Sequence, residues 1–289
     1  MASFMTVGEC MLPATWITSD NKLFHLALMR DGTLGVYWGA DPHAGGYPLW
    51  RTPSPGPVKG PFFAKLFRDG LLAICLGTPP EGDGGRLWES PFAEPGDYYL
   101  ALQVDGNLCI YPGKDPPHNK GPAMWCIAGP GPDVVQDLGL RTVVSCVGPP
   151  FGQVGTPLVL TPDKHRVNVT IEPSGFQWRL LKWRSRYLFI DPQTNMALYS
   201  QGRAKPVTLG PVSDKTFWNF GGEEYSPFYH PDHPRAIQSY APIGQNLNVA
   251  GDGPWVKGAE VIVYDWVAHE TTPVPMNLIW STRPDPFTP

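Results

Sequence analysis

Four polar side chains occupy odd-numbered positions of one short segment: Gln103, Asp105, Asn107 and Tyr111. An ionised aspartate only accepts hydrogen bonds, the two amides donate and accept, and tyrosine adds a hydroxyl group on a flat ring. Side chains two residues apart on a strand point to the same face of the sheet. These four residues, which we call the polar comb, would therefore form a flat row that can hydrogen-bond to neighbouring hydroxyl groups of a ligand.

Other constellations that could carry chemistry are missing from the sequence. It has no H-E-x-x-H, no G-x-S-x-G and no phosphate-binding loop, so we expect no enzyme, no cofactor and no metal site. The five cysteines are odd in number and include no C-x-x-C pair: Cys10, Cys75, Cys109, Cys126 and Cys146. This pattern favours free thiols in a reducing compartment over a disulfide framework. Cys109 is then a small apolar residue beside the comb.

The polar comb lies in the third copy of an internal repeat. Asp-Gly pairs recur at nearly constant spacing, and a tryptophan follows each pair: Asp31, Asp69 and Asp105 mark the pairs, and Trp50, Trp88 and Trp125 follow them. Apolar residues recur at even-numbered positions of each copy: Leu28, Leu34 and Val36, then Leu66, Leu72 and Ile74, then Leu102, Val104, Leu108 and Ile110. Because this alternation passes through each pair in register, we expect an uninterrupted strand there. The alternative, a tight hairpin turn at each Asp-Gly, stays open.

Only the third copy carries the complete comb. Its positions hold Met29 and Thr33 in the first copy, and Phe67 and Leu71 in the second. We therefore expect one working site among three copies of the same fold element.

The third copy resembles the Q-x-D-x-N-x-V-x-Y mannose-binding motif of the bulb-type (monocot mannose-binding) lectins. It matches that motif except at Cys109, which replaces valine. The resemblance implies a β-prism II for residues 1–132, with three four-stranded sheets around a pseudo-threefold axis. It also implies that the comb binds mannose-type glycans. The family's disulfide is not assumed, because the cysteine pattern differs.

A second domain is expected at 138–289, after the Gly-Pro-Gly-Pro linker at 129–132. Three aromatic clusters that end strands recur in it, at Trp178, Trp218 and Trp280. Pieces of about 40 residues with such endings suggest a β-trefoil. Its third piece would carry an insertion at 222–243.

The last piece, around residues 247–280, resembles the ricin-B lectin repeat. That resemblance implies a galactose-type sugar site in which Asn248 supplies hydrogen bonds and Tyr264 an aromatic face. A trefoil without any sugar site is the open alternative, because a fold does not imply a function.

Composition limits the class of protein. The net charge is −4, and the sequence has no basic stripe, which argues against a nucleic-acid partner. The 32 glycines, 35 prolines and 12% aromatic residues suit short strands and turns, so we expect an all-β protein. No apolar stretch is long enough for a membrane span, and the N-terminal segment does not have the pattern of a signal peptide. We therefore expect a cytoplasmic protein, released if at all by a non-classical route; whether it forms a homodimer is left open.

Together these features predict a two-domain all-β lectin with a role in defence, the latter by analogy alone. Mannose-containing glycans are the expected partners of the first domain and galactose-type sugars those of the second. The alternative is a trefoil protease inhibitor or assembly module whose prism is vestigial.

Overall fold

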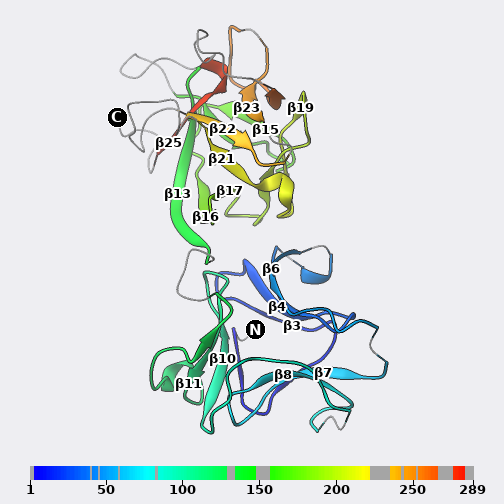
Figure 1. The fold of residues 1–289 in the computed structure, drawn as a ribbon. Coiled ribbons are helices and arrows are strands. Elements are labelled where there is room, and N and C mark those ends of the chain that lie inside the picture. Colours follow the sequence, from blue (N-terminus) through cyan, green and yellow to red (C-terminus); the bar gives the residue numbers. More distant parts are fainter. Residues whose placement is uncertain are drawn as a thin grey trace. The chain divides into compact units, whose positions relative to one another are not determined.

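A computed structural model describes residues 3–39, 41–44, 46–57, 59–81, 84–128, 134–147, 157–221, 235–241, 244–251, 253–265 and 276–283. The chain divides into two compact units, Met1–Val135 and Gln136–Pro289 (Figure 1). Over the described ranges the regular structure is β-strand plus four short 3-10 helices: η1 Pro42–Ala44, η2 Pro116–His118, η3 Asp214–Thr216 and η4 Met276–Leu278. None of the helices in this part of the chain is long and apolar enough to cross a membrane. The predicted linker at 129–132 and most of the predicted insertion at 222–243 lie outside the described residues.

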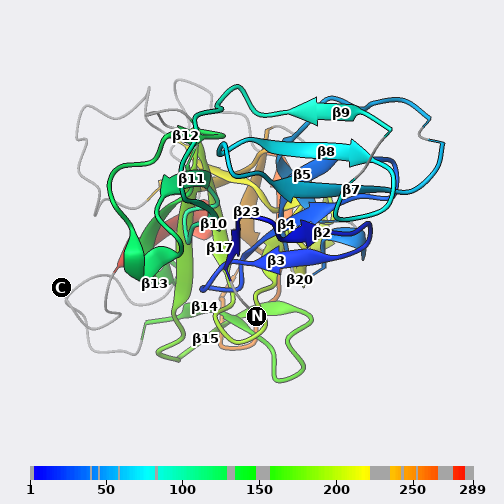
Figure 2. The same cartoon turned by 90° about the horizontal axis from the view of Figure 1, so that it is seen from below.

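The first unit is built from three four-stranded antiparallel sheets, like a β-prism (Figure 2). The first sheet has the order β3 (Trp16–Thr18), β4 (Phe24–Leu28), β5 (Leu34–Trp38), β6 (Tyr47–Arg51). The second has the order β2 (Cys10–Met11), β7 (Phe62–Leu66), β8 (Leu72–Leu76), β9 (Arg86–Glu89). The third has the order β1 (Phe4–Thr6), β10 (Tyr98–Leu102), β11 (Leu108–Pro112), β12 (Trp125–Cys126). The N-terminal segment thus gives one edge strand to each sheet.

The three Asp-Gly pairs lie in hairpin turns, and our expectation of uninterrupted strands through them is wrong. Each turn joins the two central strands of its sheet, and the leucines on either side are cross-strand partners: Leu28 with Leu34, Leu66 with Leu72, and Leu102 with Leu108. The glycines have φ of 82°, 72° and 79°, a left-handed conformation that residues with a Cβ adopt at a cost. Val104 lies in the third turn with 57% of its surface exposed, so it does not point inward as expected.

The repeated tryptophans of the first unit contact one another. The ring centroids of Trp50 and Trp88 are 5.8 Å apart, and Trp125 lies 6.4 Å from each of them. Each side chain comes from the outer strand of a different sheet, β6, β9 or β12. The period that repeats in the sequence therefore brings three aromatic rings to one place between the sheets, where they pack mostly edge to face.

Six strands of the second unit close into a ring. Their pairings run in the order β13 (Gln136–Ser145), β16 (Trp178–Trp183), β17 (Arg186–Ile190), β21 (Trp218–Phe220), β22 (Arg235–Ser239), β25 (Ile279–Arg283) and back to β13. Three hairpins attach to this ring: β14 (Val159–Pro162) with β15 (Val169–Glu172), β18 (Ala197–Tyr199) with β20 (Thr208–Gly210), and β23 (Gln245–Val249) with β24 (Val261–Asp265). The short β19 (Lys205–Pro206) pairs with β24.

The three terminal tryptophans of the second unit occupy equivalent positions in this architecture. The indole N–H of Trp178 donates to the carbonyl of Leu160 at 2.9 Å. Trp218 makes the same bond to Leu198 at 3.0 Å, and Trp280 makes it to Leu247 at 2.9 Å. All three rings are buried, and each ties a ring strand to the first strand of a hairpin. The aromatic period seen in the sequence is therefore a structural repeat.

Candidate functional site

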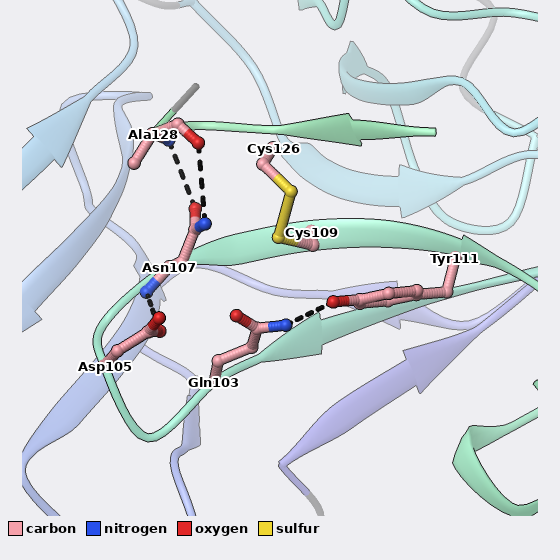
Figure 3. Close-up of a disulfide and its surroundings, with 7 residues drawn as sticks. All are labelled: Gln103, Asp105, Asn107, Cys109, Tyr111, Cys126 and Ala128. Carbon is pink, nitrogen blue, oxygen red and sulfur yellow. Dashed lines mark hydrogen bonds between the residues drawn. A yellow bond between two sulfur atoms is a disulfide. The ribbon is translucent and has the colours of Figure 1, made fainter. Parts of the chain in front are cut away.

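The polar comb lies on the third sheet, in the turn 103–107 and on β11 (Figure 3). Gln103 extends its side chain along the sheet, and its amide N–H donates to the hydroxyl of Tyr111. The Tyr111 ring stacks on that of buried Tyr99, with centroids 5.5 Å apart and planes 17° apart. All four comb residues are half-buried. The hydroxyl-bearing end of the comb is therefore held before any ligand arrives.

Asp105 shapes the turn as well as belonging to the comb. One carboxylate oxygen, Oδ1, accepts the backbone N–H of Asn107 at 2.9 Å. Two backbone carbonyls of the turn are also bonded from outside it: Val104 O accepts the Asn21 amide at 2.6 Å, and Asp105 O accepts the Val135 N–H at 2.9 Å. Because the turn is fixed at these points, its side chains lose little conformational freedom when a ligand binds.

Asn107 is held by the backbone of Ala128. Its Oδ1 accepts the Ala128 N–H at 3.1 Å, and its Nδ2 donates to the Ala128 carbonyl at 3.5 Å (Figure 3). Ala128 follows the two-residue strand β12. The motif gives no sign of this contact. The partner of Asn107 is a backbone group, and every residue type has one, so the sequence does not mark it.

A disulfide joins Cys109 to Cys126, and the expectation that all five cysteines are free thiols is wrong. The two residues are cross-strand partners on β11 and β12, with Cα atoms 4.2 Å apart and a sulfur–sulfur bond (Figure 3). Cys109 is therefore one half of a covalent link at the position where the lectin motif has valine. The pairing was missed because it depends on the register of a two-residue strand.

The comb keeps hydrogen-bonding capacity for a ligand. Among the described residues nothing donates to Oδ2 of Asp105 or to Oε1 of Gln103. Asn107 has a second amide hydrogen, and the Tyr111 hydroxyl can still donate its own proton. The side chains thus keep acceptors and donors available beside one hairpin, although Gln103, Asp105 and Asn107 lie in its turn and not along one strand as expected.

In the first sheet the aspartate is engaged within its own turn. Asp31 Oδ1 accepts both the backbone N–H and the hydroxyl of Thr33, at 3.0 and 2.7 Å. Burial alone would raise the pKa of Asp31, but these hydrogen bonds and the nearby Arg51 charge outweigh it and lower the pKa. Tyr37, at the position of Tyr111, is 4% exposed. This copy therefore has neither the amides of the comb nor an accessible tyrosine, although Asp31 itself is exposed.

In the second sheet the same positions form an apolar cluster. Leu71, Ala73 and Cys75 are buried together with Phe63, and Phe67 packs against them. The Lys65 ammonium and the Arg86 guanidinium each lie 5.0 Å from the centroid of the Phe67 ring. On this face, among the described residues, only the Asp69 carboxylate, one oxygen of which closes the turn, is left as an acceptor for a sugar hydroxyl.

The predicted galactose-site residues lie on neighbouring strands of the second unit. Asn248 on β23 is 9% exposed, and its Oδ1 accepts the Asn277 amide at 2.7 Å. Tyr264 on β24 is 40% exposed, with the Arg203 guanidinium 5.2 Å from its ring centroid. Arg203 also pairs with Asp265 at 2.6 Å. The side chain of Asn248 is therefore already hydrogen-bonded within the protein, and the Arg203 cation lies over the ring of Tyr264.

The free thiols are poorly placed for nucleophilic chemistry. Burial raises the pKa of Cys146 to about 11, and burial also raises the pKa of Cys10 and Cys75. A thiol must be ionised to attack, so all three are largely inert at neutral pH. In the described part of the chain no group of three or more His, Cys, Asp or Glu side chains is placed to hold a metal ion.

Comparison with known proteins finds similar solved structures. No protein-family model and no curated protein matches the chain. A monocot mannose-binding lectin from Gastrodia elata is 21% identical over 43% of this chain and 94% of its own, with a TM-score of 0.34. The mannose-specific agglutinin of snowdrop (Galanthus nivalis), complexed with methyl-α-D-mannoside, is 24% identical over 40% of this chain and 93% of its own, with a TM-score of 0.31. The designed threefold-symmetric protein ThreeFoil is 17% identical over 50% of this chain and 98% of its own, with a TM-score of 0.39.

Proposed function

We propose that this chain is a carbohydrate-binding lectin that recognises mannose-type glycans through one site, the polar comb of the third sheet. The observation that carries the proposal is the contrast among three equivalent hairpins. Only the third brings two amides and a half-buried tyrosine beside the aspartate of the turn. The first has Met29, Thr33 and the buried Tyr37 at those positions, and the second is apolar beside its aspartate. A pyranose with adjacent hydroxyl groups is the ligand class that fits such a set of donors and acceptors.

The chemistry of the comb favours binding without catalysis. Asp105 is the only carboxylate of the comb, and hydrolysis of a glycosidic bond ordinarily needs a pair of them. A shallow, half-exposed row also leaves the ligand in contact with water. We expect a millimolar dissociation constant, about −4 kcal/mol, so that useful affinity comes from several sites acting together.

For the second unit we propose a β-trefoil. The closed six-stranded ring, the three attached hairpins and the three tryptophan-to-carbonyl bonds support this assignment. A galactose-type site at Asn248 and Tyr264 stays a prediction, and the burial of Asn248 weighs against it. If this unit binds no sugar, a role in binding a protein partner takes its place.

A glycan array probed with the intact protein tests the proposal. Hits confined to glycans with terminal mannose support the comb as the binding site. Additional galactose-terminated hits support the second site as well. An array without hits contradicts the lectin proposal and supports the alternative, a protease inhibitor or assembly module with a vestigial prism.

A further inference from the structure

The outer strand of the third sheet is shorter than its counterparts. β12 has two residues, whereas β6 has five and β9 has four. A shorter strand forms fewer backbone hydrogen bonds with its neighbour, so it is held less firmly. Two flanking backbone bonds, Met124 N to Ile110 O and Ile127 N to Leu108 O, extend this short pairing, and any further link to β11 adds to the restraint on the Ala128 backbone that follows.

In the other two sheets a hydroxyl group secures the residue after the outer strand. Thr52 Oγ1 accepts the backbone N–H of Leu34 at 3.1 Å, and Ser90 Oγ accepts that of Leu72 at 3.1 Å. The equivalent residue of the third sheet is Ile127, which shares the backbone bond, to Leu108 O at 3.0 Å, but has no hydroxyl. The third sheet therefore lacks this bond from a backbone N–H of the inner strand to a side-chain hydroxyl, which we call the latch.

The disulfide occurs only in the sheet that lacks the latch. At the position of Cys109 the first sheet has Gly35, opposite Arg51, and the second has Ala73, opposite Glu89. Only Cys109 and Cys126 can form a covalent link between the inner and outer strands. Two residues beyond that link, Ala128 holds the amide of Asn107.

We propose that the Cys109–Cys126 disulfide is a positioning device for the sugar site: it anchors β12 so that Ala128 fixes the side chain of Asn107 in the comb. The proposal rests on the proposed function for its effect on binding, whereas the anchoring itself is a property of the unliganded protein. Without the link, β12 is expected to detach part of the time, and Asn107 then samples several rotamers and meets a sugar hydroxyl less often.

The test uses the full chain and the substitution pair C109A/C126A. We expect affinity for methyl α-mannoside to fall about tenfold, the loss typical of one misplaced hydrogen bond. By NMR, the Asn107 side-chain amide should move toward the position of a solvated amide, and the Ala128 amide should exchange faster. Adding Ile127→Thr to the pair restores the hydroxyl latch and should recover most of the affinity and both resonances.

A matched control separates positioning from general loss of stability. Thr52→Val removes the latch of the first sheet, so it should lower stability and leave mannoside affinity and the Asn107 amide unchanged. If C109A/C126A binds mannoside within twofold of the parent and leaves both resonances unmoved, the proposal is overturned.

Two further outcomes are covered by the same readouts. If C109A/C126A does not fold, the folded parent is reduced with dithiothreitol: the disulfide takes up two electrons and two protons, and the dithiol closes to a cyclic disulfide. Resonances that stay in place once both thiols are free then overturn the proposal, and resonances that move support it.

A parent that binds no mannoside contradicts the proposed function, and the Asn107 and Ala128 resonances still decide the anchoring.

Discussion

The carboxylate of Asp105 closes a hairpin turn and, in the proposed function, also binds the sugar. Oδ1 closes the turn through the Asn107 N–H, as Asp31 and Asp69 close their turns through Thr33 and Leu71. The shared role explains why aspartate recurs in all three copies, including those without a comb. The recurrence of aspartate therefore indicates only the turn. Whether a ligand binds has to be inferred from the residues around each aspartate.

Asp105→Asn separates these two roles. The amide oxygen can still accept the turn hydrogen bond, but the charge and the second acceptor are lost. We expect mannoside binding to weaken by about 2 kcal/mol, which on a millimolar site abolishes measurable binding. Titration calorimetry measures the effect, and Asp69→Asn, in the same turn of the second sheet, should bind like the parent. Equal effects of the two substitutions would show that the site lies elsewhere.

His25 makes the stability of the first unit depend on pH. It is 4% exposed, its Nε2 donates to Gly39 O at 2.6 Å, and its Nδ1 accepts the Thr18 hydroxyl at 3.0 Å. Burial lowers the pKa of His25 from 6.5, although the bond to Gly39 and the charge of Asp41 oppose this. Since the unfolded chain then binds the proton more readily, this contribution is complete above about pH 6.5 and is lost as the pH falls through the lower, folded-state pKa.

We therefore expect the melting temperature of the first unit to fall between pH 7 and pH 5. The variant His25→Gln has no titratable ring, so it should lack this part of the pH dependence. Melting followed by circular dichroism at several pH values checks both. Parallel pH profiles for parent and variant would refute the assignment to His25.

At the scale of elements, the sequence predicts the strands better than the turns. The repeat period, the inward leucines and the recurring tryptophans all appear in the fold as expected. The hairpin turns were missed for a geometric reason. Leu102 and Leu108 flank a turn of five residues and sit six positions apart, so the even-numbered alternation continues across the turn. The position of Val104, which is exposed, holds arginine in the other two copies, Arg30 and Arg68, a sign of the turn that our expectation of uninterrupted strands overlooked.

The supports of the comb are less visible in a sequence than the comb itself. The four comb residues share one short segment, so local spacing reveals them. The Ala128 backbone and the disulfide come from β12, whose register depends on the whole sheet. Tertiary pairing of this kind leaves no periodic trace in the sequence.

The tryptophan bonds of the second unit predict where it is vulnerable. Trp218→Phe removes the donor to the carbonyl of Leu198 in a fully buried site and leaves a small cavity. We expect the free energy of unfolding to fall by about 2–4 kcal/mol. Denaturant unfolding checks this, with Trp255→Phe as control: its indole bonds Gly251 O at 3.1 Å on a half-exposed side chain, so its loss should cost less. Equal costs would mean that the buried bond has no special weight.

The whole molecule combines one comb with a second unit of different architecture. Two of the three sheets of the first unit have the turn and the tryptophan without the comb, so this fold element does not depend on the comb. One comb in one chain predicts one mannoside bound per chain. Stronger binding to a glycan surface then has to come from self-association or from a contribution of the second unit.

Titration of the isotope-labelled full chain with methyl α-mannoside, followed by NMR, tests the central claim most directly. The account predicts saturable shifts at residues 103–111 and 126–128, a millimolar dissociation constant and one mannoside per chain. The turns at 29–33 and 67–71 should not respond. No shifts at tens of millimolar, or shifts centred away from the third sheet, would contradict it.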